Sequence, residues 1–234
     1  ISIGAINIDH NIRESSYKDS EFVKDYCKKS QIACHFFKLD LKTKEYENNL
    51  ENAARNARYK IFHNLIQNKE FDYIATAHHA YDNAETVLMH LIRGSGLKGV
   101  SGINLRTPQG IIRPLLYTSK QQIQKYITDN SIPYVTDETN LQTEFDRNFI
   151  RIEILPKIIS RFPHAIDNIN SFAKTARADN DYIEQNVPIL NKTQNNEVFI
   201  PEEDFKNSDS IINREIINAL NLLGITHDIE YKHI

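Results

Sequence analysis

The fold is indicated most clearly by residues 74–103, which read IATAHHAYDNAETVLMHLIRGSGLKGVSGI. The segment begins as an apolar strand, continues as an amphipathic helix and ends in a loop with four glycines. Between strand and helix stand His78, His79, Asp82 and Glu85. Because ligands bind at the carboxyl ends of the strands in open α/β sheets, this turn is the first candidate for a functional site.

Strand-like and helix-like segments alternate along the first part of the chain. Apolar strands are predicted at residues 2–9, 33–41 and 71–77. Amphipathic helices are predicted between and after them, at residues 15–30, 47–69 and from residue 80 onward. This alternation predicts an α/β fold with a parallel sheet covered by helices on both faces and joined by right-handed crossovers.

The pattern becomes mainly helical after Pro163. Further helices are predicted at residues 119–129, 164–187 and 208–223. Another helix is predicted around Pro156, which interrupts it. We therefore expect an α/β domain at residues 1–160 and a smaller, mainly helical domain at residues 161–234. The chain starts with Ile1 inside a predicted core strand and ends without a helix-stopping signal, so we expect a fragment truncated at both ends.

The composition is that of an ordinary globular protein, with 40% hydrophobic and 25% charged residues. The net charge of −3 excludes a protein that binds nucleic acid through bulk basicity, although a local basic groove is allowed. Cys27 and Cys34 have the spacing of neither a zinc site nor a CxxC redox pair, which favours a reducing cytoplasm. No apolar run approaches the roughly 18 residues of a membrane span, and no signal peptide opens the chain.

Helical spacing separates two faces of the helix after His79. The predicted core stripe consists of Ala84, Val87, Leu88, Leu91 and Ile92. Asp82, Glu85 and Met89 lie off this stripe, within roughly 60° of one another at about 100° per residue. The two carboxylates thus share a face that does not pack on the sheet. They suit Mg²⁺ or an amine, but acidic residues also stabilise a helix start by themselves, and both interpretations stay open.

Two further features of this segment favour a site over simple packing. His78 and His79 stand together in the turn, whereas a single histidine there is usually structural. The loop RGSGLKG, residues 93–99, adds Arg93 and Lys98 on flexible backbone that suits a phosphate or nucleotide. The alternative for the loop is a simple glycine C-cap at Gly94.

Residues 77–103 closely resemble a signature of bacterial tRNA(Ile)-lysidine synthetases, which are N-type ATP-pyrophosphatases of the PP-loop family. Three more stretches carry the resemblance in the same order: NIDHNIRESSYKDSEFV (7–23), ENAARNARY (51–59) and DETNLQTEFDRNFIRIEILP (137–156). Each stretch alone is a moderately specific match to the family. The stretches together, in this order over about residues 9–157, are a highly specific match. The resemblance implies an adenine nucleotide alpha hydrolase-like, Rossmann-like catalytic domain, here incomplete.

The resemblance also implies a reaction. Enzymes of this family adenylate the C2 oxygen of the wobble cytidine of tRNA(Ile) with ATP, and a lysine amine then attacks C2 and expels AMP, which forms lysidine. The implied cofactors are ATP and Mg²⁺, and the implied partners are L-lysine and tRNA(Ile) with a wobble cytidine. The expected location is the cytoplasm without membrane contact, and a homodimer is left open as the assembly.

Candidate roles follow for residues in each of the similar stretches. The catalytic candidates are His78, His79, Asp82 and Glu85, and Asp82 is also the candidate metal ligand. The candidates for cofactor binding are Asp9, His10, Arg55, Arg58 and Arg93. The candidates for nucleic-acid binding are Lys98, Arg147 and Arg151. For Arg55, Arg58, Arg147 and Arg151 the alternative is a surface ion pair.

The sequence departs from the family pattern in two places. Tyr81-Asp82-Asn83 stands where the family usually has Asp-Asp-Gln, although the second Asp is kept. The family's Ser-Gly-Gly-x-Asp-Ser pyrophosphate loop occurs nowhere in the sequence, and RGSGLKG does not replace it because it follows a helix rather than a strand. We therefore expect the fragment by itself to be inactive, since the leaving pyrophosphate lacks its backbone donors.

Two other functions remain open at this point. The first is another PP-loop tRNA-modifying enzyme, such as a thiolase, whose chemistry commonly relies on reactive cysteines. Cys27 falls on a helix stripe and Cys34 begins a strand, so both are predicted to be packing residues. The second is a fragment that binds tRNA without catalysis.

Overall fold

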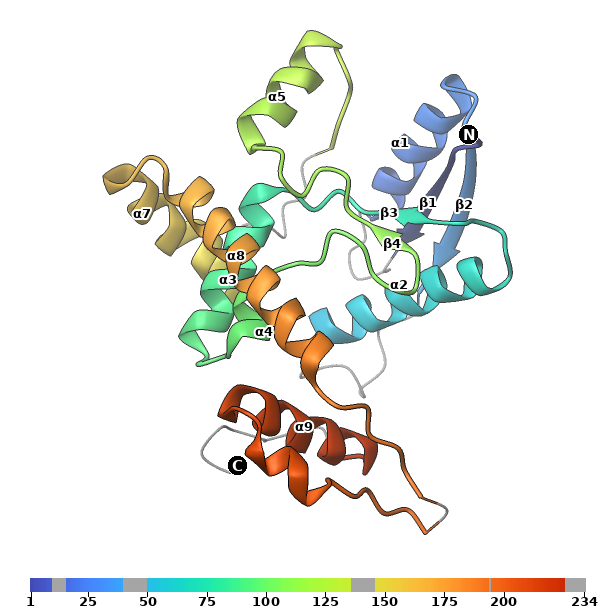
Figure 1. The fold of residues 1–234 in the computed structure, drawn as a ribbon. Coiled ribbons are helices and arrows are strands. Elements are labelled where there is room, and N and C mark those ends of the chain that lie inside the picture. Colours follow the sequence, from blue (N-terminus) through green and yellow to red (C-terminus); the bar gives the residue numbers. More distant parts are fainter. Residues whose placement is uncertain (10–15, 40–49, 136–145, 194, 226–234) are drawn as a thin grey trace. The chain divides into compact units, whose positions relative to one another are not determined.

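The computed structural model describes residues 1–9, 16–39, 50–135, 146–193 and 195–225 (Figure 1). The chain divides into two compact units, each built from several segments. Unit 1 contains Ile1–Ala77, Leu105–Leu115 and Gln121–Thr139, and unit 2 contains His78–Asn104, Leu116–Lys120 and Asn140–Ile234. The sequence predicts a single domain boundary at residue 160, whereas each unit combines several segments of the chain. The predicted boundary therefore stays a prediction.

Unit 1 has the parallel α/β character that the sequence predicts. Strands β1 (Gly4–Asp9) and β2 (Ala33–Lys38) pair in parallel, with Gly4 opposite Ala33 and Asp9 opposite Lys38, and helix α1 (Ser16–Lys29) connects them. Strands β3 (Ile74–Ala75) and β4 (Ile111–Ile112) form a second parallel pair. Helix α2 (Leu50–Gln67) precedes β3, and α5 (Lys120–Asp129) follows β4.

The core of unit 1 explains why these segments fold together. Apolar side chains from α2, β3 and β4 are buried against one another, namely Phe62, Leu65, Ile74 and Ile111. Partly buried side chains of β1 and β2 pack against this cluster, namely Ile6, Ile8 and Phe37. Strand β3 is shorter than the predicted residues 71–77, since it pairs with β4 over only two residues. The carboxyl end of β3 leads directly into the turn that carries the candidate site.

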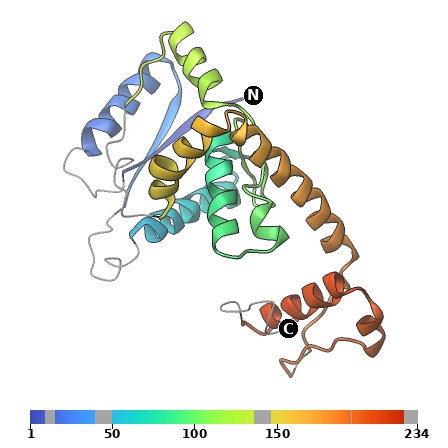
Figure 2. The same ribbon diagram turned by 90° about the vertical axis from the view of Figure 1, so that its left-hand side faces the viewer.

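Unit 2 is built around three helices that pack together, α3 (Ala80–Ile92), α4 (Leu97–Val100) and α8 (Ala165–Asn186) (Figure 1, Figure 2). Their shared core consists of Val87, Val100, Ala173 and Ala176, with Ile169 against it. The remaining elements are α6 (Asp146–Phe149), the π-helix η3 (Ile150–Ile154), α7 (Leu155–Arg161), the 3-10 helix η4 (Glu202–Lys206) and α9 (Asp209–Leu222). Within the described ranges, no helix combines the length and apolarity needed to cross a bilayer.

The predicted core stripe of α3 is only half right. Ala84 and Val87 are buried, but Leu91 and Ile92 are exposed. The helix ends at Ile92, and Gly94 turns the chain with a φ of 74°, so the packed core covers only the earlier turns. Glu85, which the spacing places off the core, is instead completely buried, because side chains from α6 and η3 enclose it.

Pro156 lies at the start of α7, within a helical run that continues from α6 through η3. Its missing N–H removes one backbone hydrogen bond of this run, which fits the predicted interruption. The irregularity is found just before it, in the π-helical turn of η3. Such turns are rare and occur frequently at functional sites.

Gly102 is required by its backbone and by a close neighbour. Its φ is 68°, and an added Cβ would lie 2.3 Å from Oδ1 of Asn83. Gly94 has a φ of 74° but open space around it. We expect Gly102→Ala to lower the free energy of unfolding by about 2–3 kcal/mol and Gly94→Ala by about 1 kcal/mol, because only the first adds a clash to backbone strain. Urea unfolding measures both, and equal losses would contradict the assigned clash.

We expect Glu215 of α9 to make the stability of unit 2 depend on pH, because its carboxyl group is buried. Its side chain is fully buried, and the Asp204 carboxyl group lies close to it. Burial raises the pKa of Glu215, and the nearby Asp204 carboxylate raises it further. A carboxyl group whose pKa is higher in the folded state contributes stability below its unfolded pKa, and this contribution is lost as the pH rises through the folded pKa.

We therefore expect Glu215→Gln to raise the melting temperature at pH 8, corresponding to a stabilisation of about 2 kcal/mol, and to leave it nearly unchanged at pH 4. Thermal unfolding between pH 4 and pH 8 measures the difference. Glu203→Gln is the matched control, because Glu203 lies beside Asp204 but is exposed. An equal effect of the two variants at pH 8 would show that Glu215 does not carry this pH dependence.

Candidate functional site

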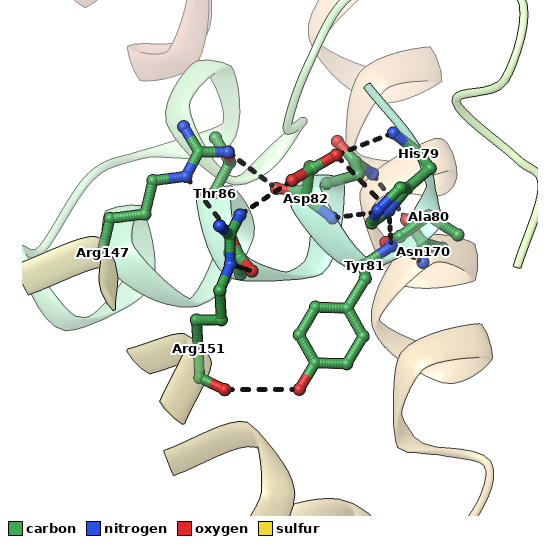
Figure 3. Close-up of polar contacts among 10 residues, drawn as sticks. His79, Ala80, Tyr81, Asp82, Thr86, Arg147, Arg151 and Asn170 are labelled. Carbon is green, nitrogen blue, oxygen red and sulfur yellow. Dashed lines mark hydrogen bonds and ion pairs between the residues drawn. The ribbon is translucent and has the colours of Figure 1, made fainter. Parts of the chain in front are cut away.

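The first turn of α3 is closed by reciprocal hydrogen bonds between His79 and Asp82 (Figure 3). The ring Nδ1 of His79 accepts from the backbone N–H groups of Tyr81 at 3.2 Å and of Asp82 at 3.4 Å. Oδ2 of Asp82 accepts from the backbone N–H of His79 at 2.9 Å. Both residues thus cap the helix in a capping box, and this arrangement holds the Asp82 carboxylate at the mouth of α3.

Glu85 lies one turn further along α3 and is held by two arginines. Its Oε1 accepts from Nε of Arg151 at 2.6 Å, and its Oε2 accepts from Nη2 of Arg151 at 2.8 Å and from Nε of Arg147 at 3.1 Å. Nη2 of Arg151 also donates to Oδ1 of Asp82 at 3.0 Å. The four charged groups therefore form one connected network, which we call the carboxylate–arginine cluster and define as Asp82, Glu85, Arg147 and Arg151.

The local sequence explains why two arginines reach the same carboxylate. Arg147 in α6 and Arg151 in η3 are four residues apart along a continuous helical segment, so both project from one face toward α3 (Figure 3). The hydroxyl of Tyr81 donates to the backbone carbonyl of Arg151 at 3.5 Å, and Oγ1 of Thr86 donates to the backbone carbonyl of Asp82 at 3.0 Å. These contacts fix the backbone on both sides of the cluster.

The electrostatics of the cluster are balanced, with two carboxylates facing two guanidinium groups. The hydrogen bonds to Glu85 raise the pKa of Arg151, and burial only partly offsets them. Burial also raises the pKa of the Tyr81 phenol, with Glu85 adding to the effect and Arg151 opposing it. Arg151 therefore stays charged and Tyr81 stays neutral at physiological pH.

Exposure distinguishes the two carboxylates. The side chain of Glu85 is 0% exposed, whereas those of Asp82, Arg147 and Arg151 are 14%, 22% and 29% exposed. Asp82 and the two arginines thus form an accessible rim above a buried carboxylate. Such a rim can bind a cation through Asp82, an anion through the guanidinium groups, or a molecule that carries both charges.

The surface ion-pair alternative therefore needs correction for Arg147 and Arg151. Both make ion pairs, but their partner Glu85 is completely buried, so the pairs are not of the weak, solvent-exposed kind. The spacing of Arg147 and Arg151 is a signal that they share a helix face. The identity of their partner is visible only in the tertiary structure.

The remaining candidates of unit 2 lie on more exposed positions. Arg93 is the C-cap of α3 and pairs at 2.5 Å with Asp146, a mostly exposed carboxylate. Lys98 is exposed on α4, a short helix where a flexible loop was expected. Gly94 has the positive φ of a helix C-terminal glycine, so the C-cap interpretation of the loop start is supported. His78 is half-buried immediately before the capping residue.

The described candidates of unit 1 lie on β1 and α2. Asp9 is the last residue of β1, where its backbone carbonyl accepts from the N–H of Leu39 at 2.8 Å. Arg55 is exposed on α2, with its guanidinium carbon 5.0 Å from the ring centroid of Tyr59. Arg58 is half-buried on the same helix. His10 lies outside the described residues.

The carboxylates do not present a donor set that fits Mg²⁺. Every oxygen of Glu85 and Asp82 already accepts from a protein donor. Among the described residues, no group of three or more His, Cys, Asp or Glu side chains is arranged to hold a metal ion. The predicted role of Asp82 as a metal ligand therefore finds no geometric support here.

Two polar residues of the site region, one buried and one half-buried, are absent from the candidates found by sequence. Asn83 is buried on α3, between Asp82 and Glu85 in sequence, and its Nδ2 donates to Oδ1 of Asn170 at 2.7 Å. Arg177 of α8 donates to the backbone carbonyls of Ser101 and Ile103. Asparagine on a helix is usually a cap or a surface residue, so the only local signal for Asn83 is its place within the similar stretch.

Comparison with known proteins places the chain among PP-loop proteins. Residues 1–158 match the family model of the PP-loop domain. The tRNA(Ile)-lysidine synthase of Clostridium acetobutylicum is 34% identical, over 100% of this chain and 52% of its own length. That of Thermosipho africanus is 36% identical, over 74% of this chain and 43% of its own length. The chain thus spans about half the length of the curated relatives it matches.

A solved structure agrees at the level of fold. The U34-tRNA thiolase NcsA from Methanococcus maripaludis superimposes with a TM-score of 0.61, over 74% of this chain and 62% of that chain. Its sequence identity is 17%, so this similarity supports the fold alone.

Proposed function

Because the chain belongs to the PP-loop domain family, we propose that it is part of an enzyme that uses ATP to join L-lysine to C2 of the wobble cytidine of tRNA(Ile). The observation that carries this proposal is the carboxylate–arginine cluster at the start of α3. The names of the relatives that align over the whole chain support the choice of lysine and tRNA(Ile).

The cluster suits a substrate that carries an ammonium group. Asp82 is the more exposed carboxylate, and among the described residues one of its oxygens accepts only from Nη2 of Arg151. An incoming ammonium can replace this guanidinium at Asp82 while Arg151 keeps its two bonds to Glu85. Asp82 then pairs with the ammonium group and Glu85 still pairs with both guanidinium groups, so each of these charged groups keeps a partner of opposite sign.

The chemical steps require other groups as well. The lysine nitrogen that attacks C2 must be neutral, so a second group has to accept its proton. His78 and His79 precede α3 and stay candidates for this role or for contacts to ATP and the cytosine. The wobble cytidine lies in single-stranded RNA, where a base is most easily extruded into a pocket.

We assign the binding of nucleotide and tRNA to the remaining candidates. Asp9, Arg55, Arg58 and Arg93 stay predicted contacts for ATP, and Lys98, Arg147 and Arg151 stay predicted contacts for tRNA phosphates. Mg²⁺ would offset the charge on the phosphates of ATP. The carboxylates of Asp82 and Glu85 do not fit this ion, because protein donors already occupy their oxygens. Cytoplasmic location and a homodimer also stay predictions.

The thiolase alternative is disfavoured by the cysteines. Cys27 is buried in α1, and burial together with the adjacent Cys27 raises the pKa of Cys34 to about 11. The reactive form of cysteine is the thiolate, which is scarce at neutral pH for a thiol of this pKa. The fold similarity to a thiolase therefore does not extend to a reactive cysteine among the described residues.

The proposal is tested by incubating the protein, as its gene encodes it, with ATP, radiolabelled lysine and tRNA(Ile) transcripts. We expect label in a transcript with cytidine at the wobble position and none in a matched transcript with uridine there. Sulfur incorporation without lysine would support the thiolase alternative. Tight binding of tRNA without incorporation of either would support the non-catalytic alternative.

A further inference from the structure

We infer that Asn170 of α8 is a positioning residue, which holds the first turns of α3 so that Asp82 and Glu85 face the substrate. The inference rests on the proposed function, because it concerns the same lysine site. It assigns α8, which the sequence places in the second domain, a direct part in the geometry of that site.

Asn170 contacts α3 through both ends of its side-chain amide. Nδ2 donates to the backbone carbonyl of Ala80 at 3.0 Å and to the carbonyl of Ile166 in its own helix at 2.8 Å. Oδ1 accepts from Nδ2 of Asn83 at 2.7 Å. Figure 3 shows Asn170 beside the first turn of α3, next to Ala80. The side-chain amide of Asn170 therefore holds this turn through hydrogen bonds to the backbone of Ala80 and to the side chain of Asn83.

Asn83 continues the network to the loop after α4. Its Oδ1 accepts from the backbone N–H of Ile103 at 2.6 Å. Gly102 leaves the space for this contact, because a Cβ at that position would overlap Oδ1 of Asn83. Arg177, also on α8, donates to the carbonyl of Ile103 at 2.9 Å. Helix α8 thus holds α3 through Asn170 and the loop after α4 through Arg177.

The position of Asn83 connects this network to the candidate site. Asn83 stands between Asp82 and Glu85 in sequence, and one residue corresponds to a rotation of about 100° around the helix. The bonds of Asn83 therefore limit rotation of α3 about its axis, and the bond at Ala80 limits sliding along it. Rotation or sliding would move both carboxylates relative to Arg147 and Arg151, which come from a different segment.

The test compares Asn170→Ala with Asn186→Ala. Asn186 is exposed on the same helix and makes the same kind of bond, from Nδ2 to the carbonyl four residues earlier at 2.7 Å, but no bond to α3 is found for it among the described residues. In the lysine incorporation assay we expect Asn170→Ala to lower kcat/KM for lysine roughly ten- to hundred-fold, mainly through KM, since ångström-scale misplacement has effects of this size. The KM for ATP and the parameters of Asn186→Ala should stay unchanged.

A purely structural role would give a different result. If Asn170→Ala only reduced the folded fraction, kcat would fall for all substrates and the KM for lysine would not change. Asn170→Asp provides a second variant, because it keeps the acceptor for Asn83 and removes the donor to Ala80. An unchanged KM for lysine in both variants would overturn the inference.

Two further comparisons make the test specific. Asn83→Ala should raise the KM for lysine in the same way, and the double variant Asn83→Ala with Asn170→Ala should be little worse than either single variant, because one network is broken once. Additive losses would overturn the inference. Failure of the proposed function is distinguishable, since no lysine would then be incorporated by the parent protein.

Discussion

Replacing Glu85 with Gln should lower the free energy of unfolding by about 3 kcal/mol, because removing one partner of a buried ion pair leaves the other charges without compensation. Glutamine keeps the size of the side chain and one acceptor oxygen, so the loss reports mainly on the charge. Two guanidinium groups, those of Arg147 and Arg151, lose their buried carboxylate at once. Their partial exposure limits the loss to the lower end of the range for such pairs.

Urea unfolding of the chain measures this effect, and Glu153→Gln is the matched control. Glu153 lies in the same π-helix as Arg151 and pairs with Lys157 at 3.3 Å, but the Glu153 side chain is 44% exposed and that of Lys157 is 75% exposed. Exposed pairs at this spacing contribute about 0.5 kcal/mol or less. If the two variants lost the same stability, the carboxylate–arginine cluster would not be a stabilising element of unit 2.

The elements that the sequence predicts well are those with a strong repeating pattern. Helices at residues 15–30, 119–129, 164–187 and 208–223 are found within one or two residues of their expected ends, as α1, α5, α8 and α9. Helix α4 has only four residues, which is too short for a periodic signal, and it was expected to be a loop. The exposure of Leu91 and Ile92 at the end of α3 depends on tertiary packing, which the helical spacing alone does not reveal.

In the candidate site, too, the features set by the local sequence were predicted, whereas those set by contacts with distant residues were not. The spacing of Asp82 and Glu85 correctly places them near one another, and the capping alternative correctly describes Asp82 and His79. The burial of Glu85 was not predicted, because it depends on Arg151, which is 66 residues further along the chain. The pairing of Asn83 with Asn170 spans 87 residues and joins two amides that have no distinctive local pattern.

The same geometry predicts the effect of removing the accessible carboxylate. Asp82→Asn should lower kcat/KM for lysine by about 10²–10³-fold, a typical consequence of removing one partner of a largely desolvated charge pair. The amide cannot offer a negative charge to an ammonium group. Its oxygen can still accept from the N–H of His79, so the capping-box hydrogen bond from this N3 position is kept. The melting temperature should therefore change little.

Asp146→Asn is the matched control for this variant. Asp146 also pairs with an arginine, Arg93, but its side chain is 73% exposed and stands outside the carboxylate–arginine cluster. We expect lysine incorporation by the Asp146 variant to equal that of the parent.

Full lysine incorporation by Asp82→Asn would show that Asp82 does not contribute to the lysine site. A large drop in its melting temperature, with activity lost for all substrates in proportion, would leave Asp82 only its role as a helix cap. A selective loss of lysine use in a folded protein is the result that the position of Asp82, above the buried Glu85 and beside Arg151, leads us to expect.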